Sequence, residues 1–288
     1  MSAVPEAPRT ADAPVFDRPV FIVSSPRSGS ARLFDALAGA PEVFTVGKQA
    51  HRLIESIPSL DVRQRGFDSN RLDAGDATAH VVGELRRVLR EHARDRDGAA
   101  PGSGPFRLLD KTPKNALRIP FLAEAFPEAH FLYYHRDPRE VLAQMLLAWH
   151  SGQYRTYMGL PGWPHRYWAL LLTPGWRELA DRSIVEIVVA QWKVALQILL
   201  DDLEALPAHR WRVVRHADLV DNPSGEIARL CLALDYRWDR PLDGGLARQP
   251  DPASADDAAV IRGYAAELQR LWPGVQPLAE RAAKFAGG

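Results

Sequence analysis

Short apolar runs alternate with segments of helical periodicity along most of the chain. The apolar runs span 19–24, 106–109, 130–134 and 211–215. The helical segments span 31–38, 115–125, 138–150, 184–206, 225–232 and 258–271. Continuous apolar runs are typical of strands buried on both faces of a parallel sheet. Their alternation with helices predicts an α/β fold, a three-layer domain around a central, mostly parallel sheet.

Three segments lie outside this alternation. Residues 1–17 are rich in Ala, Pro and charge, which predicts a disordered N-terminal segment before a single domain over 18–288. Residues 151–180 are dense in aromatic residues, Gly and Pro, and are expected to form a lid or substrate loop. The segment 241–257 is rich in Pro, Gly and Asp.

Composition narrows the class of protein. Hydrophobic residues make up 46% and charged residues 25%, as in ordinary globular domains. Basic and acidic residues balance at 36 each, which argues against a nucleic-acid coat protein or a polybasic membrane binder. The single cysteine, Cys231, excludes a disulfide framework and a Cys-rich zinc site. With no apolar run near the roughly 18 residues of a membrane helix and no signal-peptide pattern, we expect a soluble cytoplasmic protein.

The loop after the first apolar run predicts an anion site. It reads Ser-Pro-Arg-Ser-Gly-Ser over 25–30 and leads directly into a helical segment. Arg27, Ser28 and Ser30 offer donors, Gly29 lets a ligand approach the backbone, and a helix start presents free N–H groups. The Gly-Lys-Ser/Thr spacing of a Walker loop is missing, so a nucleotide-dependent phosphotransferase is disfavoured. The structural alternative is an ordinary tight turn.

Two further cations follow apolar runs. Arg136 follows the run at 130–134, and Lys111 follows the run at 106–109. Ligands of open α/β sheets bind at the carboxyl ends of the strands, so both side chains are expected at the site. For Lys114, a solvated surface position and a place in the site remain equally open.

His51 is the candidate general base. It lies four residues before Glu55, on the same face if the segment is helical. Histidine is the side chain best suited to proton transfer near neutral pH. The alternative, a purely structural histidine, stays open on the sequence alone.

Aromatic residues dominate the segment 154–176. Tyr154, Tyr157, Trp163 and Trp168 are the candidate substrate contacts. If they face a cleft, we expect a small acceptor that is apolar or aromatic, because a protein or polysaccharide acceptor would call for more basic residues than Arg155 and Arg166. Packing of the loop onto the core through its aromatic rings is the alternative.

Together these segments resemble the sulfotransferase family that uses 3′-phosphoadenosine-5′-phosphosulfate (PAPS), and more narrowly its bacterial members with a Pro-Arg-Ser-Gly-Ser loop. The resemblance runs from about Val20 to Asn222. It also includes Ile54-Glu55, 65–70, 111–115, 161–164, Gln191-Trp192 and 218–220. It implies the P-loop-like sulfotransferase fold, PAPS as donor, adenosine 3′,5′-bisphosphate as product, and no metal.

The resemblance also assigns roles to single residues. Arg27, Ser28, Gly29 and Ser30 match the loop that holds the 5′-phosphosulfate, and Arg136 matches the arginine of the 3′-phosphate. Lys111 matches a lysine near the transferring sulfuryl group. The expected catalytic residues are therefore His51, Lys111 and Arg27. The implied reaction moves a sulfuryl group to a hydroxyl or amine of a small, partly apolar metabolite, as in secondary metabolism.

Four features depart from the family pattern. Ala31 replaces a threonine of the phosphate loop, Gln144 replaces a serine near the 3′-phosphate, and Gln49 lies at an acceptor-facing position where an amide cannot act as a base. The segment 251–257 is acidic where relatives carry cations. These departures motivate two alternatives: a sulfotransferase-fold enzyme repurposed for cyclisation or elimination, and a non-catalytic anion-binding module.

Overall fold

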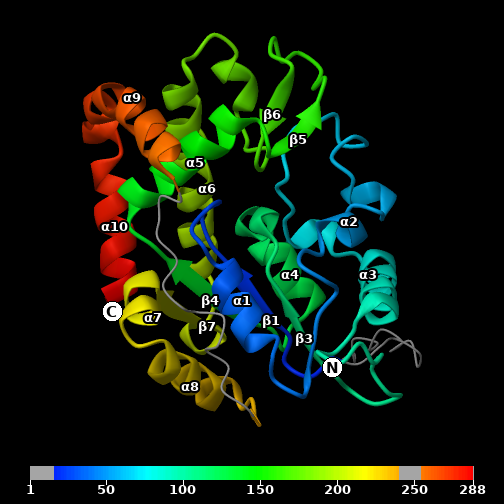
Figure 1. Cartoon of the computed structure of the whole chain (residues 1–288). Coiled ribbons are helices and arrows are strands. Elements are labelled where there is room, and N and C mark those ends of the chain that lie inside the picture. Colours follow the sequence, from blue (N-terminus) through cyan, green and yellow to red (C-terminus); the bar gives the residue numbers. More distant parts are fainter. Residues whose placement is uncertain (1–15, 240–253, 288) are drawn as a thin grey trace, which may run out of the picture.

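A five-stranded parallel sheet forms the centre of the computed structural model, which describes residues 16–239 and 254–287 (Figure 1). The strand order is β2-β3-β1-β4-β7. The bounds are β1 Val20–Val23, β2 Val43–Phe44, β3 Arg107–Asp110, β4 His130–His135 and β7 Trp211–Arg215. Every neighbouring pair is parallel, so the carboxyl ends of these strands meet at one edge. The predicted parallel α/β sheet is confirmed.

Helices cover both faces of this sheet. Val20 and Ile22 of β1 pack into one hydrophobic cluster, whereas Phe21 and Val23 pack into the other. The first face is covered by α1 Ala31–Leu37, α7 His216–Asp221 and α8 Pro223–Leu234. The second face is covered by α3 Ala79–His92, α4 Ile119–Ala125, α5 Pro138–Ser151 and α6 Ile184–Glu204. Successive side chains of a strand point to opposite faces, so these clusters form the two interfaces of a three-layer fold.

The helix expected over 115–125 is interrupted. A 3-10 helix spans Pro113–Leu117, and α4 begins only at Ile119. The break follows from Pro120, which has no N–H to donate and is tolerated only in the first turn of a helix. The interruption leaves the Arg118 side chain fully buried, with 1% of its surface exposed.

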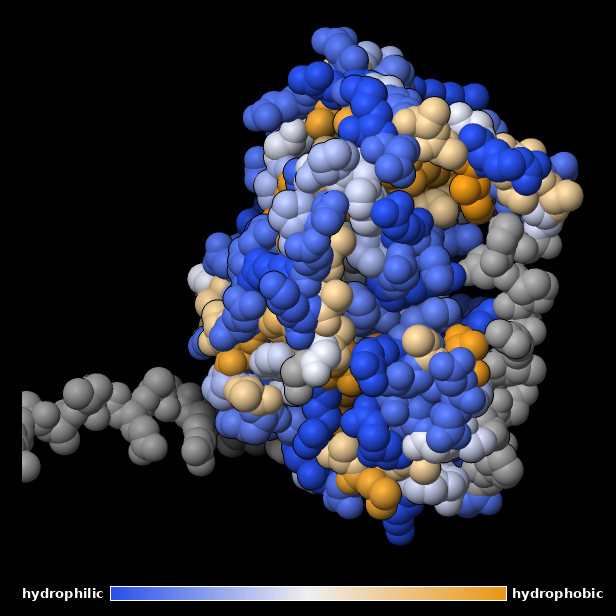
Figure 2. Space-filling view, turned by 90° about the vertical axis from the view of Figure 1, so that its left-hand side faces the viewer, coloured by the Kyte–Doolittle hydropathy of each residue, from blue (hydrophilic) through white to orange (hydrophobic). Residues whose placement is uncertain are grey.

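The C-terminal helices complete the second face. Both α9 Ala255–Leu271 and α10 Gln276–Gly287 pack against α6, and α10 also reaches β4 and β7. The outer face that includes them is mostly hydrophilic, with small separate hydrophobic spots (Figure 2). Ser254 caps α9, and Asp256 and Asp257 lie in its first turn, where carboxylates are favourable. The rest of the acidic segment, up to residue 253, lies outside the described residues.

The folded domain begins earlier than the sequence indicated. Phe16 is buried and forms a β-bridge with Phe106, and Asp17 pairs with Arg107 at 2.8 Å. Both residues belong to the segment 1–17 that the sequence predicts to be disordered, and in the structure they pack against β3. Residues 1–15 lie outside the described part of the chain.

The segment 151–180 forms more regular structure than expected. An antiparallel hairpin joins β5 Arg155–Met158 to β6 Tyr167–Ala169, and a 3-10 turn follows over Trp176–Leu179. The hairpin lies at the end of the molecule toward which the central strands run (Figure 1). Across residues 16–239 and 254–287, no helix is both long and apolar enough to cross a membrane.

Candidate active site

A cleft of about 570 Å³ lies at the carboxyl edge of the sheet. Four segments line it: the loop after β1, the short helix α2 His51–Ile54, the segment after β3, and the β5–β6 hairpin. These segments are far apart in the sequence but meet because the parallel strands end together. The residues of the predicted anion loop therefore face the candidate base and the candidate substrate residues across one space.

The loop over 25–30 has unusual backbone geometry and unpaired donors. Arg27 has φ +64°, a left-handed conformation that costs free energy for a residue with a side chain, and Gly29 has φ +92°. The Arg27 guanidinium lies over the Tyr154 ring, 4.4 Å from its centroid. Arg27 Nε and Ser28 Oγ are buried, and neither has a hydrogen-bond partner within the described ranges. Buried donors without partners are rare, and here they fit a ligand that brings anionic oxygens.

Arg136 lies on the other side of the same loop. Its Nη1 is 3.5 Å from the Ser28 carbonyl oxygen, and its Nε donates to Glu140 Oε2 at 2.6 Å. It lines a small hollow beside the loop together with Ser25 and Ser28 rather than the main cleft. Arg27 follows β1 and Arg136 follows β4, and these strands are neighbours, so both residues lie at the carboxyl edge of the sheet but line different hollows.

Lys111 is a buried cation in the cleft. Only 9% of its surface is exposed, and burial lowers its pKa. The neighbouring Asp110 carboxylate accepts hydrogen bonds from Thr112 at 3.0 Å and from Asn115 at 2.7 Å instead. Lys111 makes no hydrogen bond or ion pair with any residue that the structure describes. The ammonium group is therefore available to a negatively charged ligand.

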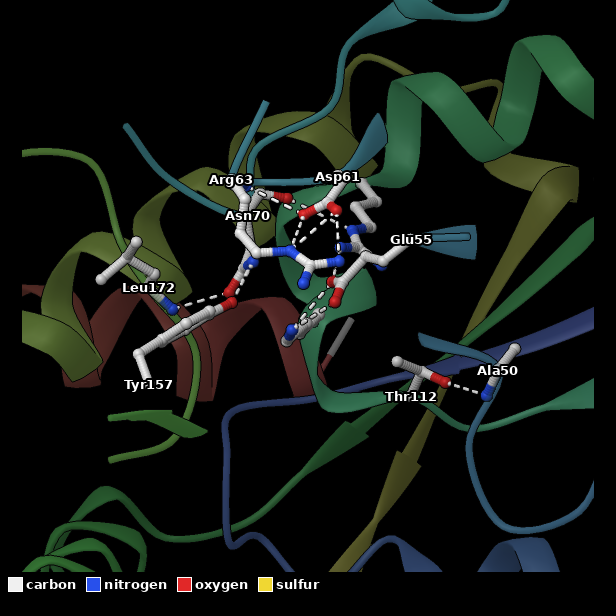
Figure 3. A network of polar contacts seen from close by, with 10 residues as sticks. Ala50, Glu55, Asp61, Arg63, Asn70, Thr112, Tyr157 and Leu172 are labelled. Carbon is white, nitrogen blue, oxygen red and sulfur yellow. Dashed lines mark hydrogen bonds and ion pairs between the residues drawn. The ribbon is translucent and has the colours of Figure 1, made fainter. Parts of the chain in front are cut away.

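A buried charge network supports the cleft wall (Figure 3). Glu55 accepts hydrogen bonds from Lys114 Nζ at 2.8 and 2.9 Å and from Arg118 Nη2 at 2.5 Å. Burial acts to raise the pKa of Glu55, but the two cations outweigh it, and the pKa lies below its usual range. Lys114 is 7% exposed, so the alternative of a solvated surface lysine is excluded.

The network continues to the hairpin through Asn70. Its amide donates to the Tyr157 hydroxyl at 2.6 Å, and its carbonyl oxygen accepts from the Leu172 N–H at 2.7 Å (Figure 3). Lys114 Nζ lies 5.1 Å from the centroid of the Tyr157 ring. Tyr157 is thereby held against the cleft wall from two sides.

His51 lies at the start of α2 and lines the cleft. Burial, and next the positive charge of Lys114, lower the pKa of its imidazole. The ring is therefore neutral near pH 7, the state in which it can accept a proton. Glu55 closes the single turn of α2, its N–H donating to the His51 carbonyl oxygen at 2.9 Å.

The structure separates the other expected site residues into two groups. Ser30, Ala31, Gln49, Tyr154 and Tyr157 line the cleft. Trp163, Trp168 and Gln144 do not line it.

Trp163 and Trp168 were expected to contact substrate, and the structure contradicts this. Both lie in the hydrophobic core, where their ring centroids are 4.9 Å apart. Their indole N–H groups donate to backbone carbonyls of the same segment. A loop tryptophan can pack inward or face a ligand, and the sequence does not distinguish the two.

Several residues of the site carry little local signal in the sequence. Glu55 and Arg118 are 63 positions apart, and Asn70 and Tyr157 are 87 apart. Arg52 and Arg155 also line the cleft and were not among the expected site residues. Within the described ranges, no group of three or more His, Cys, Asp or Glu residues is placed to hold a metal ion.

Comparisons with known proteins identify the family of the chain. The model described as "Sulfotransferase family" matches residues 19–240. Protein-tyrosine sulfotransferase A of Caenorhabditis elegans is 24% identical over 223 residues, which cover 76% of this chain and 50% of that protein. The chain thus spans half the length of this curated relative.

Two solved structures are similar in fold. The sulfotransferase from Alicyclobacillus acidocaldarius superposes with a TM-score of 0.50 at 14% identity, covering 89% of this chain and 96% of that one. The sulfotransferase domain from the curacin biosynthetic pathway has a TM-score of 0.49 at 19% identity, covering 85% and 83%. The first of these supports the P-loop-like fold expected from the sequence.

Proposed function

The chain belongs to the sulfotransferase family, and we propose that it transfers a sulfuryl group from PAPS to a hydroxyl or amine of a small, partly apolar metabolite. One observation carries this proposal most directly. The unpaired donors of Arg27 and Ser28 face the same cleft as the unpaired Lys111 ammonium and the neutral His51.

The residues present fit such a donor. When bound, PAPS supplies the sulfuryl group and an adenosine bisphosphate leaving group. Arg27 and Ser28 have free donors for the oxygens of its 5′ end, and Arg136, on the other side of the loop, is the candidate for the 3′-phosphate. Lys111 would stabilise the negative charge that grows on the transferred and leaving oxygens.

The acceptor side of the cleft has its own residues. Neutral His51 would accept the proton of the attacking hydroxyl or amine. Tyr154, Tyr157, Leu170 and Leu171 provide apolar surface for the acceptor. Trp163 and Trp168 do not line the cleft and support these residues only by packing in the hydrophobic core.

Binding of adenosine 3′,5′-bisphosphate tests the donor pocket. Arg27→Ala should weaken binding by about 1.5–3 kcal/mol, roughly 10- to 150-fold in Kd, because a charge-assisted hydrogen bond is lost. Isothermal titration calorimetry measures this, with Arg87→Ala on the exposed face of α3 as the matched control. A wild-type protein that binds no bisphosphate, or turns over an acceptor without PAPS, would contradict the assignment.

The pH profile of kcat/KM tests the two titrating groups. Because the pKa of His51 is lowered from 6.5, activity should fall only as the pH drops below that value and the imidazole becomes protonated. Because the pKa of Lys111 is lowered from 10.5, activity should also fall on the alkaline side, before pH 10.5, as the ammonium loses its proton. His51→Gln should remove the acid limb, and Lys111→Arg should shift the alkaline limb upward. An acid limb that survives in His51→Gln would assign the base to another group.

A further inference from the structure

The cleft carries an excess of positive charge. Its cationic side chains are Arg27, Arg52, Lys111, Lys114 and Arg155. Its single carboxylate, Glu55, is already engaged by Lys114 and Arg118. After this network is satisfied, Arg27, Arg52, Lys111 and Arg155 remain without a carboxylate partner within the described ranges.

Arg52 and Arg155 lie on different walls of the cleft. Arg52 belongs to α2 and follows the candidate base His51, whereas Arg155 begins β5 and follows Tyr154. Neither side chain makes a hydrogen bond or an ion pair with any residue in 16–239 or 254–287, although the Arg155 guanidinium lies 5.6 Å from the centroid of the Tyr167 ring. In Figure 1, α2 and the hairpin approach the same end of the sheet from separate parts of the chain.

Binding of the donor alone does not require Arg52 and Arg155. Arg27, Ser28 and Lys111 already serve its 5′ end at the strand tips, while Arg52 and Arg155 come from the segments that form the acceptor side. A bound polyanionic donor repels a second anion, and extra cations offset that repulsion. A neutral acceptor gains nothing from them, because exposed guanidinium groups are well solvated in water.

We propose that the acceptor carries an anionic group, such as a carboxylate, in addition to its attacking hydroxyl or amine. Arg52 and Arg155 bind this group from different walls of the cleft, and the planar guanidinium suits a carboxylate geometrically. Tyr157 and Leu171 contact the apolar part that separates the two ends. This acceptor class rests on the proposed sulfuryl transfer and narrows it.

Matched pairs of acceptor compounds separate the effect of the acceptor's negative charge from the effect of its other contacts. The compounds are hydroxyaryl carboxylic acids with no, one or two methylene groups between ring and carboxyl, each paired with its primary amide. Calorimetry gives Kd for each compound with the full chain saturated in adenosine 3′,5′-bisphosphate, and assays with PAPS give kcat/KM. At least one acid should bind about 10- to 100-fold more tightly than its amide, a preference that decreases with added salt.

Variants assign the preference to the two arginines. Arg52→Gln and Arg155→Gln should each reduce the ratio of acid to amide affinity, and the double variant should bring it near one. Arg166→Gln, an exposed arginine of the same hairpin loop that does not line the cleft, is the control and should leave the ratio unchanged. Binding of adenosine bisphosphate should remain in every variant.

Three results would overturn the inference. The first is that the acids bind no better than their amides, including the case in which neither binds measurably. The second is a preference that persists in the double variant. The third is that both substitutions weaken bisphosphate binding, which would place these arginines in the donor pocket. Loss of bisphosphate binding by the wild type is a different result, because it contradicts the proposed sulfuryl transfer itself.

Discussion

Replacing Lys111 by methionine should lower kcat by about 10²- to 10³-fold, the usual effect of removing one preorganised group that stabilises charge in a transition state. Lys111 is nearly buried and unpaired among the described residues, so its ammonium acts in a site with little water. The loss should appear mainly in kcat, because negative charge on the reacting oxygens is greatest in the transition state.

Two further measurements separate this effect from unfolding. The midpoint of thermal unfolding of Lys111→Met should be equal to or above that of the wild type, because the substitution removes an unpaired buried charge. Lys284→Met, on the exposed face of α10, is the control and should keep full activity. A Lys111→Met enzyme with unchanged kcat would remove Lys111 from the catalytic groups.

Replacing Glu55 by alanine should lower the free energy of unfolding by about 3–5 kcal/mol, the cost of removing one partner from a buried ion pair. The substitution leaves the cations of Lys114 and Arg118 buried without a carboxylate, and Arg118 Nη1 already lacks a partner within the described ranges. Urea denaturation measures the change. Glu91→Ala, which breaks an exposed pair with Arg87, is the control and should cost under about 1 kcal/mol.

Acid titration provides an independent check on Glu55. Its pKa is lower in the folded protein than its usual 4.5, so the stabilisation is present above that value and is lost as pH falls through the folded pKa. The difference in unfolding free energy between wild type and Glu55→Gln should therefore shrink on acidification. A difference that is constant from neutral to strongly acidic pH would show that the charge of Glu55 is not what stabilises the cluster.

The layered fold could be predicted because its signal is local. Every central strand except β2 is a short apolar run in the sequence, and the loop at 25–30 directly follows β1. The position of Arg27 and Arg136 at one sheet edge therefore follows from parallel pairing alone. The helix α3 was missed although Val81, Leu85 and Val88 have helical spacing, because charged residues separate its apolar positions.

The acceptor half of the site was harder to predict. Whether an aromatic residue of a long connection faces the core or a cleft depends on the packing of the whole hairpin. Trp163 and Trp168 pack into the core, whereas Tyr154 and Tyr157 line the cleft. The spacing of Glu55 from His51 is visible in the sequence, but its partner Arg118 is brought near by the break before α4, which begins at Ile119.

The departures from the family pattern have different structural meanings. Ala31 and Gln49 line the cleft and remain changes at the site, whereas Gln144 lies outside its lining. Asp256 and Asp257 serve the start of α9. Their negative charge is favourable at this helix N-terminus and does not by itself speak against an anionic ligand.

The two edge strands of the central sheet influence whether the protein aggregates at high concentration. An unprotected border strand invites pairing with another molecule and leads to aggregation. Here β2 is only two residues long, and on the opposite border the Phe285 ring of α10 stacks on Trp211 of β7 at 4.6 Å. Shortening the chain before α10 should therefore promote self-association through β7 even where the catalytic cleft is intact.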